Sequence, residues 1–143
     1  MRKINEIILH CSATPENKNF TVEDITKWHN AKGWDGCGYH YVIHLDGSIH
    51  NGRSVQKIGA HCLGHNTNSI GICYIGGVDK NGNPKDTRTD AQKKALITLV
   101  HELLIKYNLK LYQVRCHYEY AAKACPSFKR GDFKTEYLKV FKN

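Results

Sequence analysis

The stretch Glu6-Ile7-Ile8-Leu9-His10 decides how we expect the 143-residue chain to fold. Its run of large aliphatic residues is typical of a short strand that is buried on both faces. A second buried strand is predicted at residues 69–75, and a further strand at residues 111–115. Strands of this kind belong to sheets that helices cover, so we look for helices elsewhere in the chain.

A β-hairpin is predicted between the first two buried strands. Residues 39–45 and 48–52 have the composition of strands, and they flank Asp46-Gly47, which is typical of a two-residue hairpin turn. Because a hairpin joins antiparallel strands, the sheet is expected to be mixed.

Three helices are predicted from their caps and from the spacing of their apolar residues. The first begins at Thr21, which forms a capping-box pattern with Asp24, and ends at Gly33. The second covers residues 89–107 and the third residues 132–141. The apolar sides of the first two helices are expected to consist of Val22, Ile25, Trp28 and His29, and of Leu96, Leu99, Val100, Leu103, Leu104 and Tyr107.

The length and composition of the chain agree with one folded domain. The chain is near the usual domain size, and 41% hydrophobic residues are too many for a disordered protein. No apolar run approaches the ~18–20 residues needed to cross a bilayer, so no membrane insertion is expected. We therefore predict an α/β fold for residues 1–143, a single domain with a central mixed β-sheet flanked by helices.

The N-terminus and the cysteines indicate a reducing compartment. Only Ile7-Ile8-Leu9 precede His10 as an apolar run, which is too short for a signal-peptide core, so the protein is expected to be cytoplasmic as synthesised. Thiols stay reduced there, and the six cysteines contain no C-x-x-C pair. Free thiols or a metal ligand are therefore expected rather than disulfides.

Two histidines lie at the ends of predicted strands. His10 ends the first strand, and His117 lies just beyond the strand at residues 111–115, with Cys125 eight positions later. Strand ends in α/β sheets converge on a crevice, and two imidazoles with one thiolate suit Zn²⁺ with a fourth position open for water. Two other interpretations remain open: that these are ordinary buried residues, and that Cys125 or Cys11 is a thiol nucleophile beside a histidine.

The motif His10-Cys11-Ser12-Ala13-Thr14 resembles the opening motif of the phage lysozyme-type N-acetylmuramoyl-L-alanine amidases, which share their fold with the peptidoglycan-recognition proteins. Further short motifs resemble the landmarks of this family in the same order. They are Trp28-His29, Gly33-Trp34, Gly38-Tyr39-His40, Asp46-Gly47, Gly52-Arg53, Gly59-Ala60-His61, Gly64-His65-Asn66, Ser69-Ile70-Gly71 and Lys123-Ala124-Cys125-Pro126-Ser127-Phe128. The resemblance covers residues 7–128, nearly the whole chain.

The resemblance implies a zinc amidase that cleaves the amide bond between the lactyl group of N-acetylmuramic acid and L-alanine of the stem peptide. It implies one Zn²⁺ ion, with His10, His117 and Cys125 as ligands. It also implies catalytic roles for Tyr39, which would orient the water or bind the developing oxyanion, and for Lys123, which would stabilise that oxyanion. From the residues alone, Tyr39 could equally be an aromatic residue of a strand and Lys123 a surface charge.

The resemblance further implies a substrate-binding groove wall at His61, His65 and Asn66, for which a plain loop is the alternative. The sequence departs from the family pattern at Ala122, where phage members often have proline, and at Tyr118, where a close phage pattern has a second histidine. These departures do not affect the implied ligands.

The net charge of the chain bears on its partner. The formal net charge is +8, but the basic residues are spread along the chain without a nucleic-acid-binding motif, so no nucleic acid is required and an anionic cell-wall substrate is expected. We expect a monomeric endolysin that acts on peptidoglycan after release through a permeabilised membrane. The alternative functions are a peptidoglycan-binding module without activity and a thiol-dependent wall hydrolase that uses Cys125.

Overall fold

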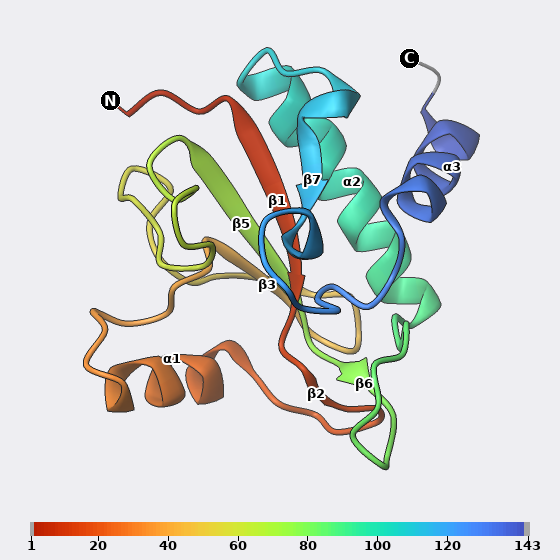
Figure 1. Ribbon diagram of the computed structural model, residues 1–143. Helices are drawn as coiled ribbons and strands as arrows, with labels where there is room; N and C mark the ends of the chain where they lie inside the picture. The colour runs from red at the N-terminus through yellow and green to blue at the C-terminus, as the bar shows by residue number, and fades with distance from the viewer. Residues whose placement is uncertain (1, 142–143) are drawn as a thin grey trace.

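A central sheet organises the computed structural model, which describes residues 2–141 (Figure 1). Its strands, in spatial order, are β4 (Ile49–Asn51), β3 (Tyr41–Ile43), β5 (Ser69–Tyr74), β1 (Glu6–Cys11) and β7 (Val114–Cys116). Strand β1 is parallel to both of its neighbours, β5 and β7, whereas β4 is antiparallel to β3. The predicted mixed sheet is confirmed. A small parallel pair, β2 (Thr14–Pro15) and β6 (Gly77–Val78), extends beyond it.

Helices pack on both faces of this sheet. Helices α2 (Asp90–Lys106) and α3 (Arg130–Val140) lie on one side of it and α1 (Val22–Ala31) on the other (Figure 1). The α2 face holds the larger core, which includes Ile7 and Leu9 of β1. The smaller core includes Ile25 of α1. The aliphatic run of β1 is almost fully buried, as expected for a central strand with both faces covered.

The predicted capping boxes are present in both helices. Thr21 and Asp24 bind each other's backbone N–H groups at the start of α1, and Thr89 and Gln92 do the same for α2. Gly33, with φ +87°, follows the end of α1. The third helix begins at Arg130, two residues earlier than expected.

The hairpin is confirmed, but its predicted two-residue turn is wrong. The N–H of His44 donates to the carbonyl of Ser48 at 3.0 Å, so residues 45–47 form a three-residue loop. Gly47 occupies the left-handed conformation, with φ +85°, that such loops require of their last residue. Strands β3 and β4 are shorter at both ends than the predicted strands at residues 39–45 and 48–52.

Two other predictions need correction. The strand predicted at residues 111–115 begins only at Val114, because Leu111–Gln113 form a 3₁₀ turn, η1. The side chain of Gln113 accepts the N–H of Lys110 at 2.8 Å and curls the chain there. Trp28, expected on the apolar side of α1, is 39% exposed and packs on Phe20 at the surface.

The described chain leaves all six cysteines as free thiols. Among residues 2–141, none of the helices is long and apolar enough to span a membrane.

Candidate metal centre

Two parallel strands bring the predicted histidine ligands together. Leu9 of β1 is paired with Cys116 of β7, so the next residues, His10 and His117, leave the same edge of the sheet side by side. Their ring centroids are 4.6 Å apart, and the two residues are 1% and 9% exposed. The two imidazoles therefore meet at the carboxyl ends of the strands, as expected.

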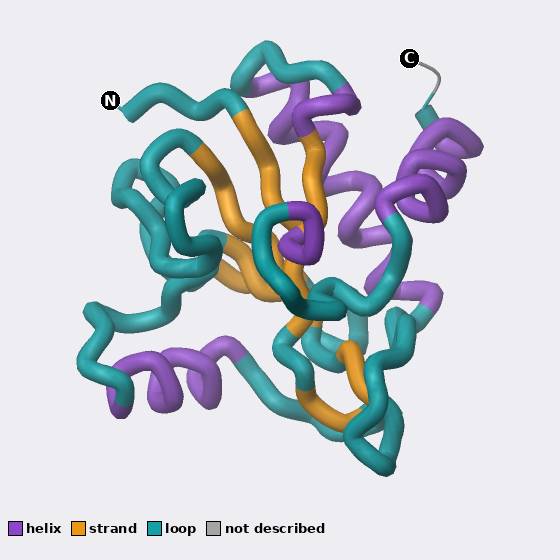
Figure 2. The backbone as a smooth tube through the Cα atoms, in the orientation of Figure 1, coloured by secondary structure: helices purple, strands orange, loops and turns teal. Residues whose placement is uncertain are grey.

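The loop after β7 returns to supply the third candidate ligand. It starts with the 3₁₀ turn η2 (His117–Glu119), and the N–H of Tyr118 donates to the carbonyl of Cys125 at 2.9 Å, which closes it. The sulfur of Cys125 lies 3.8 Å from Nδ1 of His10 and accepts the backbone N–H of Cys11 at 3.2 Å. Figure 2 shows η2 and the following loop in front of the strands.

The spacing of these donors fits a metal ion. One donor atom from each of His10, His117 and Cys125 lies within 4.8 Å of the others. We call these three residues the His–His–Cys cluster. In a tetrahedral zinc site, bonds of about 2.0–2.3 Å place the donors about 3.3–3.6 Å apart, so the cluster needs only a small contraction. The N–H that points at the sulfur also stabilises a thiolate.

The environment keeps both histidines neutral. Burial, followed by the neighbouring His61 and His117 and the charge of Lys123, lowers the pKa of His10 well below its ordinary value. Burial and Lys123 also lower the pKa of His117. The thiol of Cys11 and burial raise the pKa of Cys125, so a cation that binds this sulfur would displace a proton.

Of the two residues implied in catalysis, Tyr39 lies against the cluster and Lys123 lies in the loop that joins two of its members. The ring of Tyr39 lies 5.1 Å from that of His10, centroid to centroid, and burial raises its pKa well above the ordinary value, so its hydroxyl stays a proton donor. Lys123 is an exposed residue of the loop between His117 and Cys125. Its positive charge contributes to the lowered pKa of both His10 and His117.

The three residues expected on a groove wall lie in one loop but differ in exposure. His61 is 8% exposed, and its Nδ1 lies 2.8 Å from Nε2 of His10. The side chain of Asn66 accepts the N–H groups of His61 and Cys62, each at 2.9 Å. His65 is partly exposed and its ring stacks on Tyr120, with centroids 3.7 Å apart. Sequence reasoning missed the contact between His61 and His10, since 51 positions separate them.

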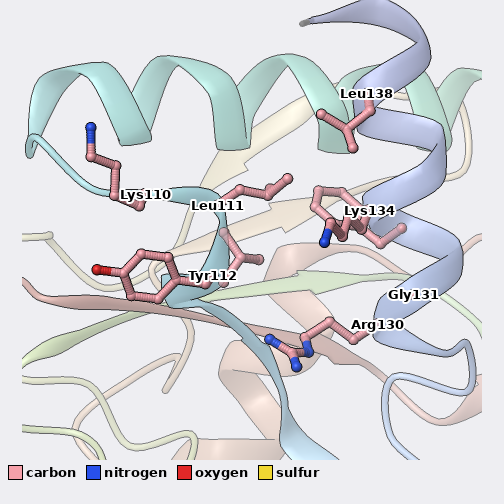
Figure 3. Close-up of a pocket in the computed structure, with 9 residues that line it drawn as sticks. Lys110, Leu111, Tyr112, Arg130, Gly131, Lys134 and Leu138 are labelled. Carbon is pink, nitrogen blue, oxygen red and sulfur yellow. The ribbon is translucent and has the colours of Figure 1, made fainter. Parts of the chain in front are cut away.

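A groove that contains none of these residues lies elsewhere in the molecule. A groove of about 860 Å³ opens between α3 and the segment that leads into β7 (Figure 3). We call it the α3 groove, and it is lined by Lys110, Leu111, Tyr112, Val114, Arg130, Gly131, Phe133, Lys134 and Leu138. None of the predicted site residues lines it.

Comparisons with known proteins show which family the chain belongs to. The model of the N-acetylmuramoyl-L-alanine amidase family Amidase_2 matches residues 1–128. The chain is 43% identical over 122 residues to the endolysin of Escherichia phage T7, covering 85% of this chain and 80% of that protein. It is 39% identical over 127 residues to the endolysin of Klebsiella phage KP32, covering 89% and 83%.

Solved structures show the same fold. The N-acetylmuramoyl-L-alanine amidase LysC from Clostridium intestinale URNW superimposes with a TM-score of 0.81 at 30% identity, covering 98% of this chain and 88% of that one. The bumblebee peptidoglycan-recognition protein PGRP-SA superimposes with a TM-score of 0.76 at 26% identity, covering 99% and 84%. The chain therefore belongs to the N-acetylmuramoyl-L-alanine amidase family and is an amidase of the phage endolysin type with the peptidoglycan-recognition-protein fold.

Proposed function

We propose that the amidase is zinc-dependent and that residues 1–143 form its single catalytic domain. It cleaves the amide bond between the lactyl group of N-acetylmuramic acid and L-alanine of the stem peptide. The observation that carries the proposal is the convergence of His10, His117 and Cys125 at one edge of the sheet. Two neutral imidazoles and a sulfur are donors that zinc prefers, and three protein ligands leave one position open to the reactants.

The residues of the cluster and those around it have different roles in the proposed amide hydrolysis. Bound zinc would supply Lewis acidity toward the amide carbonyl and lower the pKa of a water molecule. His10, His117 and Cys125 would hold the ion. The protonated hydroxyl of Tyr39 orients the attacking water or donates a hydrogen bond to the carbonyl oxygen as negative charge develops there. The ammonium of Lys123 stabilises the same charge from the solvent side of the crevice.

The loop that contains His61, His65 and Asn66 is proposed to border the bound substrate. The side chain of His65 is partly exposed, and its stacked ring offers a flat surface to a sugar or peptide. Asn66 supports this role by holding the loop backbone, and His61 by packing beneath it.

We propose that the enzyme acts as a monomer on cell-wall peptidoglycan. It would be cytoplasmic as synthesised and would reach its substrate through a permeabilised membrane. The formal charge of +8 attracts it to anionic wall polymers, and no nucleic acid is required.

Metal analysis and product analysis together test the proposal. We expect one zinc ion per chain, loss of activity on treatment with a chelator and recovery on addition of Zn²⁺. Mass analysis of digested peptidoglycan should show stem peptides with a free L-alanine amino terminus. Activity that resists the chelator but is lost on alkylation of Cys125 would overturn the zinc proposal in favour of a thiol-dependent hydrolase.

A further inference from the structure

The imidazole of His10 has a second partner besides the cluster. Its Nδ1 faces the sulfur of Cys125, and its Nε2 lies 2.8 Å from Nδ1 of His61. The rings of the two histidines are perpendicular, with centroids 4.9 Å apart, so the edge of one ring meets the edge of the other. Each neutral imidazole has one N–H and one nitrogen lone pair. In this hydrogen bond one histidine must therefore donate its N–H and the other must accept it, and which one donates fixes the tautomers of both.

The direction of that bond follows from a chain of hydrogen bonds behind His61. The hydroxyl of Ser69 lies 2.6 Å from the carbonyl oxygen of His65, and since a carbonyl only accepts, the hydroxyl proton is committed there. The oxygen of Ser69 is then an acceptor for Nε2–H of His61, at 3.2 Å. His61 therefore presents the lone pair of Nδ1, and His10 must donate Nε2–H to it.

The protons arranged in this way leave His10 with its lone pair on Nδ1. That nitrogen is the one that faces Cys125 and belongs to the His–His–Cys cluster. The opposite tautomer of His10 would carry a proton on Nδ1, and that proton would have to be removed before the nitrogen could bind a metal ion.

The packing around His61 holds its ring in this orientation. A Cβ atom added at Gly71 would lie 2.6 Å from Cγ of His61, and one added at Gly59 would lie 2.7 Å from Cδ2. The ring thus occupies space that two glycines leave free. The side chain of Asn66 also fixes the backbone of His61 by accepting its N–H. The ring is thus closely packed in the orientation that faces His10.

We propose that His61 is a positioning residue for the metal centre: it selects the tautomer and the ring orientation of His10 that bind the ion through Nδ1, and Ser69 fixes the tautomer of His61 in turn. This inference rests on the proposed zinc site and deepens it. A histidine ligand usually donates its other N–H to a carboxylate, a carbonyl or water, and loss of that partner typically costs about 10–100-fold in metal affinity. Here a neutral imidazole takes that place.

Zinc affinity tests the proposal without reference to activity. The dissociation constant is measured by competition with a chromophoric chelator for the wild type, His61→Leu and His61→Asn. Leucine keeps the apolar bulk and removes the acceptor, so we expect zinc binding to weaken about 10–100-fold. The amide oxygen of asparagine occupies the place of Nδ1 and can accept Nε2–H of His10, so His61→Asn should recover most of the affinity. Ser69→Ala should lie between the wild type and His61→Leu.

A matched control separates this role from the general loss of a buried histidine. His29 is also 8% exposed, and its Nδ1 accepts the N–H of Gly38 at 2.8 Å, but it is not bonded to the cluster. His29→Leu should keep the zinc affinity of the wild type. Equal weakening by His29→Leu and His61→Leu, or a His61→Asn variant as weak as His61→Leu, would overturn the proposal.

The tautomers can also be observed directly in the zinc-loaded protein. Long-range ¹⁵N–¹H correlation spectra should show Nε2 protonated in both His10 and His61, with His10 bound through Nδ1. A proton on Nδ1 of His61 would overturn the proposal even if zinc is bound. Absence of zinc from the wild-type protein would instead overturn the proposed zinc site, so the two failures are distinguishable.

Discussion

The His–His–Cys cluster and the α3 groove lie at different parts of the same small domain and differ in what their side chains can do. The groove has a volume of about 860 Å³ and basic side chains from Lys110, Arg130 and Lys134 around apolar ones, but its lining includes no histidine, cysteine or carboxylate. The cluster is compact, and its three donor atoms all lie within 4.8 Å of one another. We therefore place the proposed site of chemistry at the convergent donors rather than at the larger open volume.

The difference has a structural origin. The cluster forms where two parallel strands end side by side and one loop folds back, so the backbone sets the positions of its donors. The groove forms between a helix and the segment before an edge strand, and Figure 3 shows long side chains from both walls around it. Long, exposed lysine and arginine side chains adopt many rotamers, whereas buried imidazoles on strand ends do not.

Removal of a metal ligand should produce the largest effect. His10→Ala and Cys125→Ala are expected to lose bound zinc and to lower activity at least about 10³-fold, because metal-based stabilisation of the transition state amounts to several kcal/mol. Metal content and the rate of peptidoglycan hydrolysis check this on the same samples. If either variant kept full activity without zinc, the cluster would have no greater claim than the groove to be the site of catalysis.

Removal of the positive charge of Lys123 should have the second-largest effect on activity. Lys123→Ala is expected to keep zinc and to lower kcat about 10²–10³-fold, the usual result of removing one oxyanion-stabilising donor. The exposure of Lys123 means that the fold should be unaffected. A fully active Lys123→Ala enzyme would contradict the assigned role, and a zinc-free one would show that Lys123 supports the metal site instead.

Removal of the Tyr39 hydroxyl should lower kcat less than removal of the Lys123 charge. Tyr39→Phe keeps the ring against His10 and removes only a neutral donor. Since neutral hydrogen bonds are roughly half as strong as charge-assisted ones, we expect kcat to fall about 10²-fold or less, with zinc retained. Steady-state kinetics compared with those of Lys123→Ala measure this ranking, and the reverse order would contradict it.

A fourth prediction concerns stability on the α3 side of the molecule. The guanidinium of Arg88, fully buried, binds Asp86 and Glu136 at 2.9 Å each and lies 3.8 Å from the centroid of the Phe128 ring. Arg88→Met should lower the free energy of unfolding by about 2 kcal/mol, less than for fully buried pairs because the carboxylates are partly exposed. Zinc content should not change, which chemical denaturation and metal analysis can establish together.

The stabilisation by Arg88 should also depend on pH. Burial would raise the pKa of Asp86, but the hydrogen bonds and charge of Arg88 outweigh it and lower that pKa below 3.8. The contribution is complete above the ordinary pKa and is lost as the pH falls through the lowered one. The difference in unfolding free energy between the wild type and Arg88→Met should therefore shrink in acid. A constant difference would contradict this assignment.

Substitutions in the α3 groove should have the smallest effect. Lys134→Glu and Leu138→Ser alter exposed side chains, so we expect changes in unfolding free energy within about 0.5 kcal/mol and unchanged zinc content. Hydrolysis of peptidoglycan should change less than about twofold, because neither side chain belongs to the cluster and salt screens the field of an exposed charge. A large loss of activity would show that the groove takes part in the reaction after all.

Much of the fold could be predicted because its signals are local. The aliphatic run of β1 and the capping boxes at Thr21 and Thr89 depend on residues within one strand or one helical turn, and all three were confirmed. The hairpin turn and the strand at residues 111–115 were predicted less well. The hairpin loop includes one residue more than the Asp46-Gly47 pair, and a side-chain cap from Gln113 curls the chain before β7.

The sequence by itself determined the type of fold and the residues able to bind a metal ion, because periodicity, caps and strand ends are properties of short segments. Only the tertiary structure decided that His61 contacts His10 and that the N–H of Cys11 points at Cys125. These partners are 51 and 114 positions apart. Their meeting depends on strand register and on the closure of loops, which involve the whole sheet at once and leave no pattern in any one segment.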